Sequence, residues 1–227
     1  DLEAQRVQRF ASRADLERAR CTIEEREEYE PHIERGAVVY AGVDYAAVLA
    51  EAAREADVIV WDGGNNDFPF VRPDLHIVLL DPMRAGHETT HHPGEAVLRM
   101  ADVALIAKSG TATPAQIAEL ADSVRRVNAR ATILPGASPV TLEGAAGLTG
   151  KRVLVIEDGP TITHGGMPHG AGWRAATDAG ALVVDPRPWA GPELQECYRR
   201  YPHIGPVLPA LGYYPAQIDA LRECIDA

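Results

Sequence analysis

The feature that most constrains the fold of this chain is a repeated alternation of short apolar runs with amphipathic stretches of helical length. Apolar runs lie at residues 57–61, 76–80, 103–107, 131–134, 152–156 and 181–184. Helical patterns separate them, most clearly at 44–55 and 114–127. Continuous apolar strands that alternate with helices are typical of a parallel sheet buried on both faces. We therefore predict an α/β fold, with a mostly parallel sheet and helices on both of its faces.

A loop rich in Gly, Pro and Ala at residues 135–150 divides this alternation into two parts. We predict one domain over residues 1–149 and a C-terminal α/β segment over residues 150–227. Residues 1–35 read as helical, and Thr22 and Glu25 have the spacing of a capping box within them. The second segment is predicted to carry helices near 171–179, 192–200 and 215–226.

The composition excludes several classes of function. The 227 residues carry a formal net charge of −11, which disfavours a broad nucleic-acid surface, because phosphate neutralisation needs clustered Lys and Arg. No apolar stretch approaches the roughly 20 residues of a membrane-spanning helix, and no signal-peptide pattern opens the chain. The three cysteines have no metal-binding spacing and read as reduced packing residues. We expect a cytoplasmic protein without nucleic-acid or membrane partners, and we leave a homodimer open.

Polar residues follow most of the apolar runs. Asp62, Asp81, Lys108, Asp158 and Asp185 all stand where a predicted strand ends. In open α/β sheets, ligands bind beyond the carboxyl ends of the strands, so these residues are candidates for chemistry along one edge. Each aspartate has an ordinary alternative role, which is to cap the helix that follows it.

The run that ends on Asp62, Gly63 and Gly64 has the pattern of a Walker B strand. Such a strand delivers a carboxylate that can hold Mg²⁺, and glycines let the backbone approach a phosphate. Lys108 ends another strand, where a lysine stem can pack on a nucleotide base or ribose. An apolar strand followed by Asp-Gly is common, however, and a surface lysine is an equal alternative for Lys108.

The glycine-rich loop of a P-loop enzyme, G-x-x-x-x-G-K-[ST], is missing from the chain. The nearest match, at residues 147–152, has the wrong spacing and precedes a strand. Either the protein is not a P-loop enzyme, or the loop lies before Asp1. The chain starts without methionine and ends directly after a helical pattern, so we expect it to be cut at both ends.

His87, Glu88 and His91 match the H-E-x-x-H pattern of zinc peptidases. Gly86 and the Pro93–Gly94 pair bracket the match and leave little room for the long helix that such a site needs. A second constellation runs from Thr161 to Gly166 and combines hydroxyls, an imidazole and glycines near a predicted helix start. This stretch predicts an anion cradle, and a flexible loop is its alternative.

Several longer stretches together resemble the cyclic 2,3-diphosphoglycerate synthetases. They are residues 1–10, 22–33, 61–70, 73–76, 92–95, 163–167 and 201–209. The resemblance implies a P-loop NTPase-like, GTPase-like domain over residues 1–149 whose Walker A region lies upstream, followed by a substrate-binding segment over 150–227. It also implies an ATP-dependent ligase that uses Mg²⁺ to close 2,3-diphosphoglycerate, a phosphorylated small molecule, into a cyclic pyrophosphate. The fragment alone is then expected to be inactive.

The resemblance and the strand-end pattern together assign roles to particular residues. The expected catalytic residues are Asp62, His87 and His92, and Asp62 is also expected to hold the metal. The expected nucleotide-binding residues are Gly63, Gly64 and Lys108. The expected substrate-binding residues are Arg84, Thr161, Thr163, His164, Gly165 and Gly166. The family carries Asn-Lys-x-Asp where this chain has residues 107–110, which puts base recognition in doubt. The family also has an aromatic residue at His91, which makes the peptidase match an accident of one substitution.

Two rival functions stay open at this point. One is a P-loop GTPase or ATPase switch, or a metallochaperone whose histidines carry a transition metal. The other is a non-catalytic module that binds phosphorylated metabolites.

Overall fold

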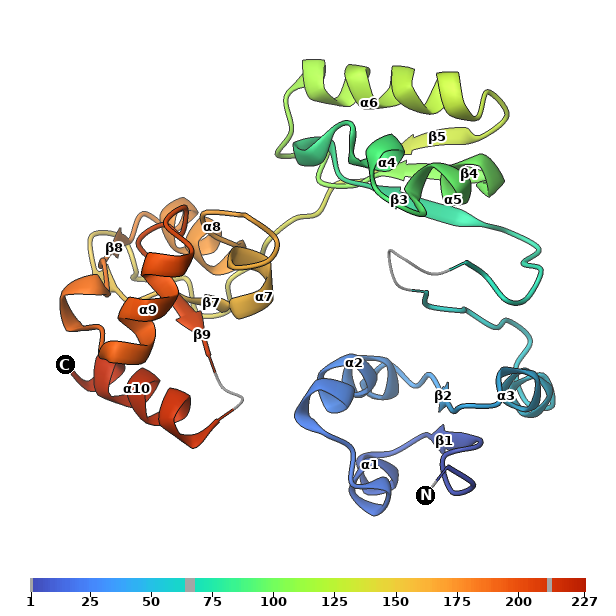
Figure 1. Cartoon of the computed structure of the whole chain (residues 1–227), viewed down its shortest axis with the longest axis horizontal. Helices are drawn as coiled ribbons and strands as arrows, with labels where there is room; N and C mark the ends of the chain where they lie inside the picture. Colours follow the sequence, from blue (N-terminus) through green and yellow to red (C-terminus); the bar gives the residue numbers. More distant parts are fainter. Residues whose placement is uncertain (1, 64–67, 212–213) are drawn as a thin grey trace. The chain divides into compact units, whose positions relative to one another are not determined.

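The structure is a computed structural model that describes residues 2–63, 68–211 and 214–227. It contains two compact units, Asp1–Pro69 and Phe70–Ala227 (Figure 1). The predicted boundary between residues 149 and 150 falls inside the second unit and stays a prediction. The α/β class is confirmed, because the strands of the second unit pair in parallel and helices pack around them.

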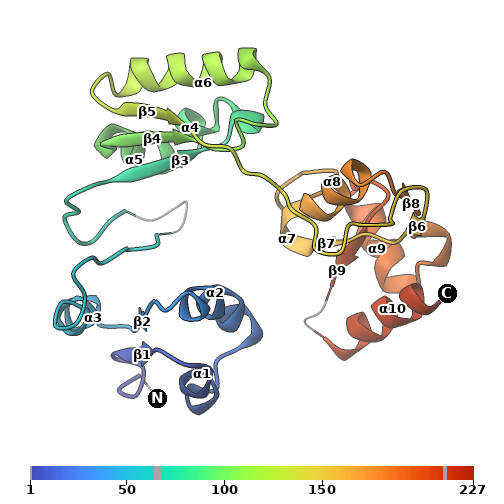
Figure 2. The same ribbon diagram turned by 180° about the vertical axis from the view of Figure 1, so that it is seen from behind.

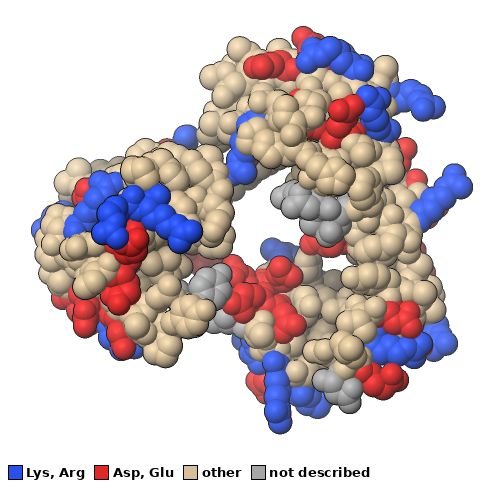
Figure 3. All heavy atoms as spheres, viewed as in Figure 1, with Lys and Arg blue, Asp and Glu red and all other residues tan. Residues whose placement is uncertain are grey.

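The first unit is built on a two-stranded antiparallel ribbon. Its elements are β1 (Gln8–Phe10), α1 (Arg13–Ala19), α2 (Ile23–Glu34), β2 (Val39–Ala41) and α3 (Tyr45–Ala52). The predicted capping box is confirmed: the Glu25 amide donates to the Thr22 hydroxyl at 3.3 Å, and the Thr22 amide donates to the Glu25 carboxylate at 2.7 Å. Acidic side chains gather over α2 (Figure 3).

The expectation that residues 1–35 are helical is wrong for β1. Phe10 pairs with Val39, and its side chain is only 2% exposed. Helix propensity depends on nearby residues and cannot report a pairing between segments so far apart. Here the pairing with β2 overrides the helix propensity of the segment.

The predicted strand at residues 57–61 is also wrong. This segment has no regular secondary structure, and the side chains of Val58 and Val60 are 78% and 83% exposed. A strand needs a neighbour for its backbone groups, and no described residue pairs with this segment.

The second unit begins with a three-stranded parallel sheet in the order β3-β4-β5. Its elements are β3 (Ile77–Leu80), the 3₁₀ turn η1 (Pro82–Arg84), α4 (His87–Thr90), α5 (Gly94–Met100), β4 (Val103–Ile106), α6 (Pro114–Val127) and β5 (Thr132–Pro135). Leu79, Leu105 and Leu134 are register partners across the three strands. Figure 2 shows the same sheet from behind.

One face of this sheet carries the core. Ala104 and Ile106 of β4 pack with Leu98 of α5 and Leu120 and Val124 of α6, and all five side chains are at most 1% exposed. Because side chains alternate along a strand, the residues between them point to the opposite face. The described residues place α5 and α6 together against the first face.

The remaining part of the unit holds two parallel strand pairs, β6–β8 and β7–β9. Its elements are β6 (Arg152–Val153), β7 (Ile156–Asp158), α7 (Gly159–Ile162), α8 (Ala171–Asp178), β8 (Leu182–Val183), η2 (Arg187–Trp189), α9 (Pro192–Arg200), β9 (Leu208–Ala210) and α10 (Pro215–Asp226). The run predicted as one strand at 152–156 is divided, because β6 and β7 pair with different partners. None of the helices among the described residues has the length and apolar character needed to cross a membrane.

Candidate functional site

The carboxyl edge of the β3-β4-β5 sheet gathers four polar residues from three strand ends. Asp81 follows β3, Arg84 ends the η1 turn, Lys108 follows β4 and Ser138 lies in the loop after β5. The Lys108 Nζ donates to Asp81 Oδ2 at 2.8 Å, and Arg84 Nε lies 3.7 Å from the same oxygen. The structure therefore brings together Arg84 and Lys108, which were predicted to bind substrate and nucleotide. It adds Asp81 as the carboxylate between them.

The electrostatics of Asp81 follow from its neighbours. Burial pushes the pKa of its carboxyl upward, but hydrogen bonds from Lys108 and from the Met83 amide outweigh this effect, so the pKa lies below its usual value. The side chain of Asp81 is 25% exposed and that of Lys108 is 44% exposed, which leaves the ion pair reachable from solvent. Asp81 thus stays charged near neutral pH and holds the Lys108 ammonium in place.

The backbone of Lys108 is also unusual. Its φ is 53°, in the left-handed region that residues other than glycine rarely adopt. Its amide donates to the Ser138 hydroxyl at 3.2 Å, and the next amide, of Ser109, donates to the Gly136 carbonyl at 3.1 Å. The turn after β4 is thereby tied to the loop after β5. Such local strain is often found at ligand sites, where the surrounding structure holds it.

Arg84 contributes a second cation to this edge. Its Nε is buried and makes no hydrogen bond to any described residue, and it pairs with Asp81 Oδ2 at the longer distance of 3.7 Å. A guanidinium beside a lysine ammonium suits an anionic group such as a phosphate or a carboxylate.

Sequence reasoning missed part of this edge. Asp81 was recognised as a strand-end residue but received no role, and Ser138 was not singled out. The signal for Asp81 was its place after β3, directly before Pro82. No local signal marks Ser138, because its contact with Lys108 joins residues 30 positions apart.

The H-E-x-x-H match does not form a metal site. The helix α4 has only four residues, His87–Thr90, and Glu88 is buried, with its carboxylate accepting from the Ser123 hydroxyl and the Gly86 amide. His87 and His91 stack with ring centroids 4.1 Å apart. Across the described residues there is no group of three or more His, Cys, Asp and Glu side chains that could hold a metal ion. Glu88 therefore serves as a structural hydrogen-bond acceptor.

His92 follows His91, after the end of α4. It lines an open cavity of about 390 Å³ together with His91, Glu95 and Arg99. Arg99 is already paired with Glu95 along α5. The proposed catalytic roles of His87 and His92 stay predictions.

The loop from Thr161 to Gly166 follows β7 and is tightly bonded to itself. The Thr161 amide and hydroxyl both donate to Asp158, at 3.1 and 2.8 Å, and the Thr163 hydroxyl donates to the Gly159 carbonyl at 2.7 Å. A Cβ on Gly165 would lie 2.3 Å from the Thr161 carbonyl oxygen, so this position requires glycine. The hydroxyls expected to cradle an anion are thus engaged within the loop. His164 is exposed, and its Nδ1 lies 3.1 Å from the Thr163 hydroxyl.

The predicted metal and phosphate residues after the 57–61 segment are only partly described. Asp62 and Gly63 are exposed, and Gly64 lies outside the described residues. Magnesium is commonly held by one or two carboxylates together with phosphate oxygens and water. An exposed Asp62 fits such a partial set, and its role stays a prediction.

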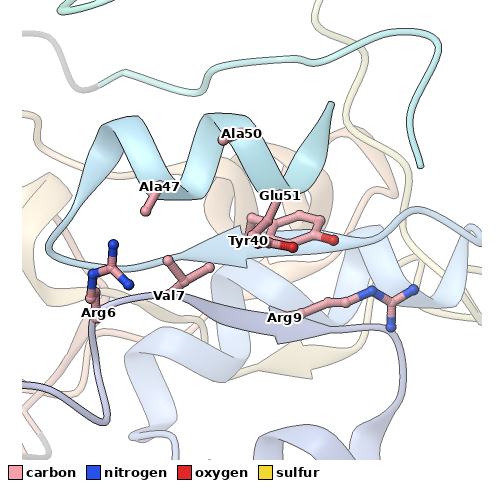
Figure 4. Close-up of a pocket in the computed structure, with 7 residues that line it drawn as sticks. All are labelled: Arg6, Val7, Arg9, Tyr40, Ala47, Ala50 and Glu51. Atoms are coloured by element: carbon pink, nitrogen blue, oxygen red, sulfur yellow. The ribbon is translucent and has the colours of Figure 1, made fainter. Parts of the chain in front are cut away.

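A larger groove, of about 510 Å³, lies in the first unit between the ribbon and α3. Arg6 and Arg9 lie at opposite ends of it (Figure 4). Both cations are paired, Arg6 with Asp44 and Arg9 with Glu55. The hydrogen bonds from Arg9 and Tyr40 hold the pKa of Glu55 at about 2. The charges of this groove therefore neutralise each other, and it does not form an anion site.

Comparison with known proteins gives one informative relative. The chain is 55% identical over all 227 of its residues to arginine synthetase ArcE of Thermococcus kodakarensis. The match covers 100% of this chain and 51% of the relative, so the chain spans about half the length of that protein. No family model matches the chain. No solved structure matches it either.

This similarity overturns the expected synthesis of cyclic 2,3-diphosphoglycerate. A relative that matches every residue of the chain carries the name of a different synthetase. The switch, metallochaperone and binding-module alternatives do not match that name either. The name of the relative agrees with the resemblance only in being that of a synthetase.

Proposed function

We propose that this chain is part of an ATP-dependent synthetase that forms arginine. The single observation that supports the proposal is the 55% identity over the full 227 residues to an arginine synthetase. The matched region spans the whole chain and so covers the sheet edge, the α4 region and the loop after β7. We extend the proposal to Mg²⁺, which the strand-end pattern predicted, and to ATP, which the family resemblance implied.

The chemistry of arginine explains why such a reaction needs ATP. In the guanidinium group one carbon is bonded to three nitrogens, so building it from a precursor with fewer nitrogens requires a new carbon–nitrogen bond. Phosphorylation can turn a carbon-bound oxygen into a good leaving group, which a nitrogen then replaces. Catalysis of phosphoryl transfer depends mainly on positioning and on neutralisation of charge.

The carboxyl edge of the β3-β4-β5 sheet supports this role. Lys108 and Arg84, both paired with Asp81, are cationic groups at the position where α/β sheets bind ligands. In the proposal they hold an anionic part of a substrate, and Asp81 positions Lys108. Asp62 remains the proposed magnesium ligand.

The reverse reaction tests the proposal without knowledge of every substrate. In the reverse direction, the full-length protein should form labelled ATP from ADP and labelled phosphate, or from AMP and labelled pyrophosphate, only when arginine is present, and this exchange is measured. Removal of Mg²⁺ with a chelator should stop the exchange. Lysine, which has the same amino-acid part and a terminal cation but no guanidinium, is the control. Exchange that is indifferent to arginine would sink the proposal.

The chain has two lysines, so one can be substituted at the sheet edge and the other can serve as the control. In the full-length protein, Lys108→Ala should lower the exchange rate by about 10²-fold, the scale for loss of one preorganised charge-stabilising group. Lys151→Ala removes an exposed lysine from the loop before β6 and should leave the rate within about twofold, as expected of a surface substitution away from a site. Equal rates in the two variants would remove Lys108 from the site while leaving the arginine assignment standing.

A further inference from the structure

The hydroxyl of Thr163 lies between two groups that compete for its single proton. Thr163 Oγ1 is 2.7 Å from the Gly159 carbonyl oxygen and 3.1 Å from Nδ1 of His164. A carbonyl oxygen can only accept, so the hydroxyl proton must point to Gly159. With the proton elsewhere, two acceptor oxygens would face each other at 2.7 Å, which is the usual length of an O–H···O hydrogen bond.

The tautomer of His164 follows from this proton count. Because the Thr163 proton is committed to Gly159, a lone pair of the hydroxyl faces the imidazole, and Nδ1 carries the hydrogen that joins them. We therefore assign the neutral ring to the Nδ1–H tautomer, which leaves its lone pair on Nε2. Protonation of the ring adds a hydrogen to Nε2 and keeps the bond to Thr163. Nε2 is thus the atom of this side chain that can take up and release a proton.

The backbone on both sides of His164 is fixed. The Thr163 amide donates to the Gly159 carbonyl at 2.9 Å, and the Gly165 amide donates to the Pro160 carbonyl at 2.9 Å. The side chain of Thr163 is buried. The imidazole is therefore held by a rigid turn in one tautomer, which is the arrangement that general acid–base catalysis requires.

A second histidine close to this loop is committed in the opposite way. Nε2 of His203 lies 2.6 Å from the Ile162 carbonyl oxygen, so Nε2 carries the hydrogen and donates it. The ring of Tyr201 contacts both imidazoles, with its centroid 5.9 Å from that of His164 and 6.2 Å from that of His203. His203 cannot release its Nε2 hydrogen without losing the bond to Ile162, so its role is to hold the two loops together.

We propose that Nε2 of His164 is the proton acceptor for the nitrogen nucleophile of the synthetase reaction, and that Thr163 positions the ring. The inference rests on the proposed formation of arginine. In that reaction the lone pair of an ammonia or amine nitrogen attacks the carbon whose oxygen ATP has phosphorylated. The new carbon–nitrogen bond forms, and the phosphorylated oxygen leaves with the electron pair of its bond to carbon. The surplus proton of the attacking nitrogen passes to Nε2 of His164 and then to water.

The groups at the sheet edge are poorly suited to accept this proton. Lys108 and Arg84 are cations without a lone pair. Asp81 is paired with both of them, and the pKa of its carboxyl lies below the usual value, which makes its carboxylate a weak base. A neutral imidazole with a lone pair on Nε2 supplies the function that these residues do not, and imidazoles change charge near neutral pH.

The arginine-dependent formation of labelled ATP tests the catalytic role in the full-length protein. His164→Ala should lower this rate by about 10²–10⁴-fold, the scale of general acid–base catalysis, because the same atom returns the proton to nitrogen in the reverse direction. Added imidazole should restore part of the lost rate, since it supplies the missing base. The control is His203→Gln, which keeps an N–H donor for Ile162 and should stay within a few-fold of wild type.

The outcomes separate this inference from the proposed function. A wild-type protein that forms labelled ATP with arginine, together with a fully active His164→Ala variant, would overturn the role of His164 and leave the synthetase assignment standing. An equal loss in His203→Gln would show that the loops matter only as structure and would also overturn that role. A wild-type protein that is indifferent to arginine would remove the proposed function and this inference together.

Nitrogen-15 NMR of the full-length protein with labelled histidine tests the tautomers without reference to activity. At alkaline pH, where imidazoles are neutral, we expect the Nδ1–H form for His164 and the Nε2–H form for His203. The signals are assigned by their loss in His164→Ala and His203→Gln. The Nε2–H form for His164 in the wild type would overturn the proposal, whether or not any variant folds.

The positioning role of Thr163 has its own test. Thr163→Val keeps the shape of the side chain but removes the hydroxyl, so His164 should lose its preference for the Nδ1–H form. The exchange rate should fall by up to about tenfold, the scale for loss of one hydrogen bond. Thr163→Ser restores the hydroxyl and should recover both the tautomer and the rate. An unchanged tautomer of His164 in a folded Thr163→Val variant would contradict the positioning role.

Discussion

The two parallel-strand regions of the second unit bury their strands in different ways. In the β3-β4-β5 sheet, the buried side chains form one cluster with α5 and α6. In the region from β6 to α10, consecutive residues enter two different clusters: Val153 and Val155 pack with Ile162 and Val207, whereas Leu154 packs with the cluster around Leu194. In the second region residues 153–155 are thus shared between two clusters, although Ile156 of β7 and Leu182 of β8 stay exposed.

The difference shows that an aliphatic strand pattern predicts burial without identifying what covers the strand. Both regions have continuous apolar runs, and both were predicted to lie between helices. Among the described residues, the β3-β4-β5 strands pack on one cluster, whereas residues 153–155 are divided between two. We expect each region to respond to substitutions in its own clusters.

The largest effect should come from the fully buried leucines of the two regions. Leu98→Ala and Leu194→Ala each remove a side chain that is 0% exposed, and each should cost about 2–5 kcal/mol of local stability through lost burial and a cavity. Hydrogen exchange of the full-length protein, read by mass spectrometry, gives the opening free energy of each region separately. A cost below about 1 kcal/mol for Leu98→Ala alone would mean that the helix-side cluster is loosely packed, and the comparison would fail.

A smaller effect is expected from the buried carboxylates, of which each region has one. Glu157 accepts hydrogen bonds from the amides of Trp173 and Gly172 at the start of α8, at 2.7 and 3.4 Å. Glu157→Ala should cost about 1.5–3 kcal/mol, because the buried amides lose a charged acceptor. Glu88→Ala should cost a similar amount, because Glu88 accepts hydrogen bonds from the Ser123 hydroxyl and the Gly86 amide in the sheet region.

The control for both carboxylates is Glu193→Ala, which changes an exposed residue on α9 and should cost less than about 0.5 kcal/mol. The measurement is again the opening free energy of each region. If both buried-carboxylate variants behaved like the control, these groups would not hold their helices and turns in place.

The smallest effect concerns the ion pair of the sheet edge and its pH dependence. Because the folded-state pKa of Asp81 lies below its ordinary value of 3.8, its charged form stabilises the fold above that pH, and this contribution is lost as the pH falls through the folded-state pKa. At pH 6, Asp81→Asn should destabilise the sheet region by about 0.5–1 kcal/mol, a modest value for a pair that is partly exposed. The difference in stability of the sheet region between wild type and Asp81→Asn should disappear below about pH 4. A gap that is constant with pH would show that the charge of Asp81 is not responsible.

Much of the local structure followed from the sequence. The predicted helices at 114–127, 192–200 and 215–226 coincide with α6, α9 and α10. The capping box of Thr22 and the strands after residues 76, 103 and 131 also formed where their patterns lie. These features depend on residues within a few positions of one another, through capping, turn chemistry and apolar periodicity.

Tertiary structure decided the features that depend on distant partners. The aliphatic run at 57–61 reads as a buried strand, yet it stays irregular because no described strand pairs with it. Conversely, the segment Gln8–Phe10, for which no strand was predicted, becomes a strand because Val39–Ala41 pairs with it. Glu88 fits a zinc motif by spacing, but folding buries it against Ser123, 35 positions away.

The sequence by itself determined the α/β class, the positions of most helices and strands, and the gathering of polar residues at strand ends. Only the tertiary structure decided that Lys108 pairs with Asp81 across 27 positions and that Arg84 lies beside the same carboxylate. The reason is physical: propensity and capping act between near neighbours, whereas strand order and side-chain pairing are set by which distant segments pack together.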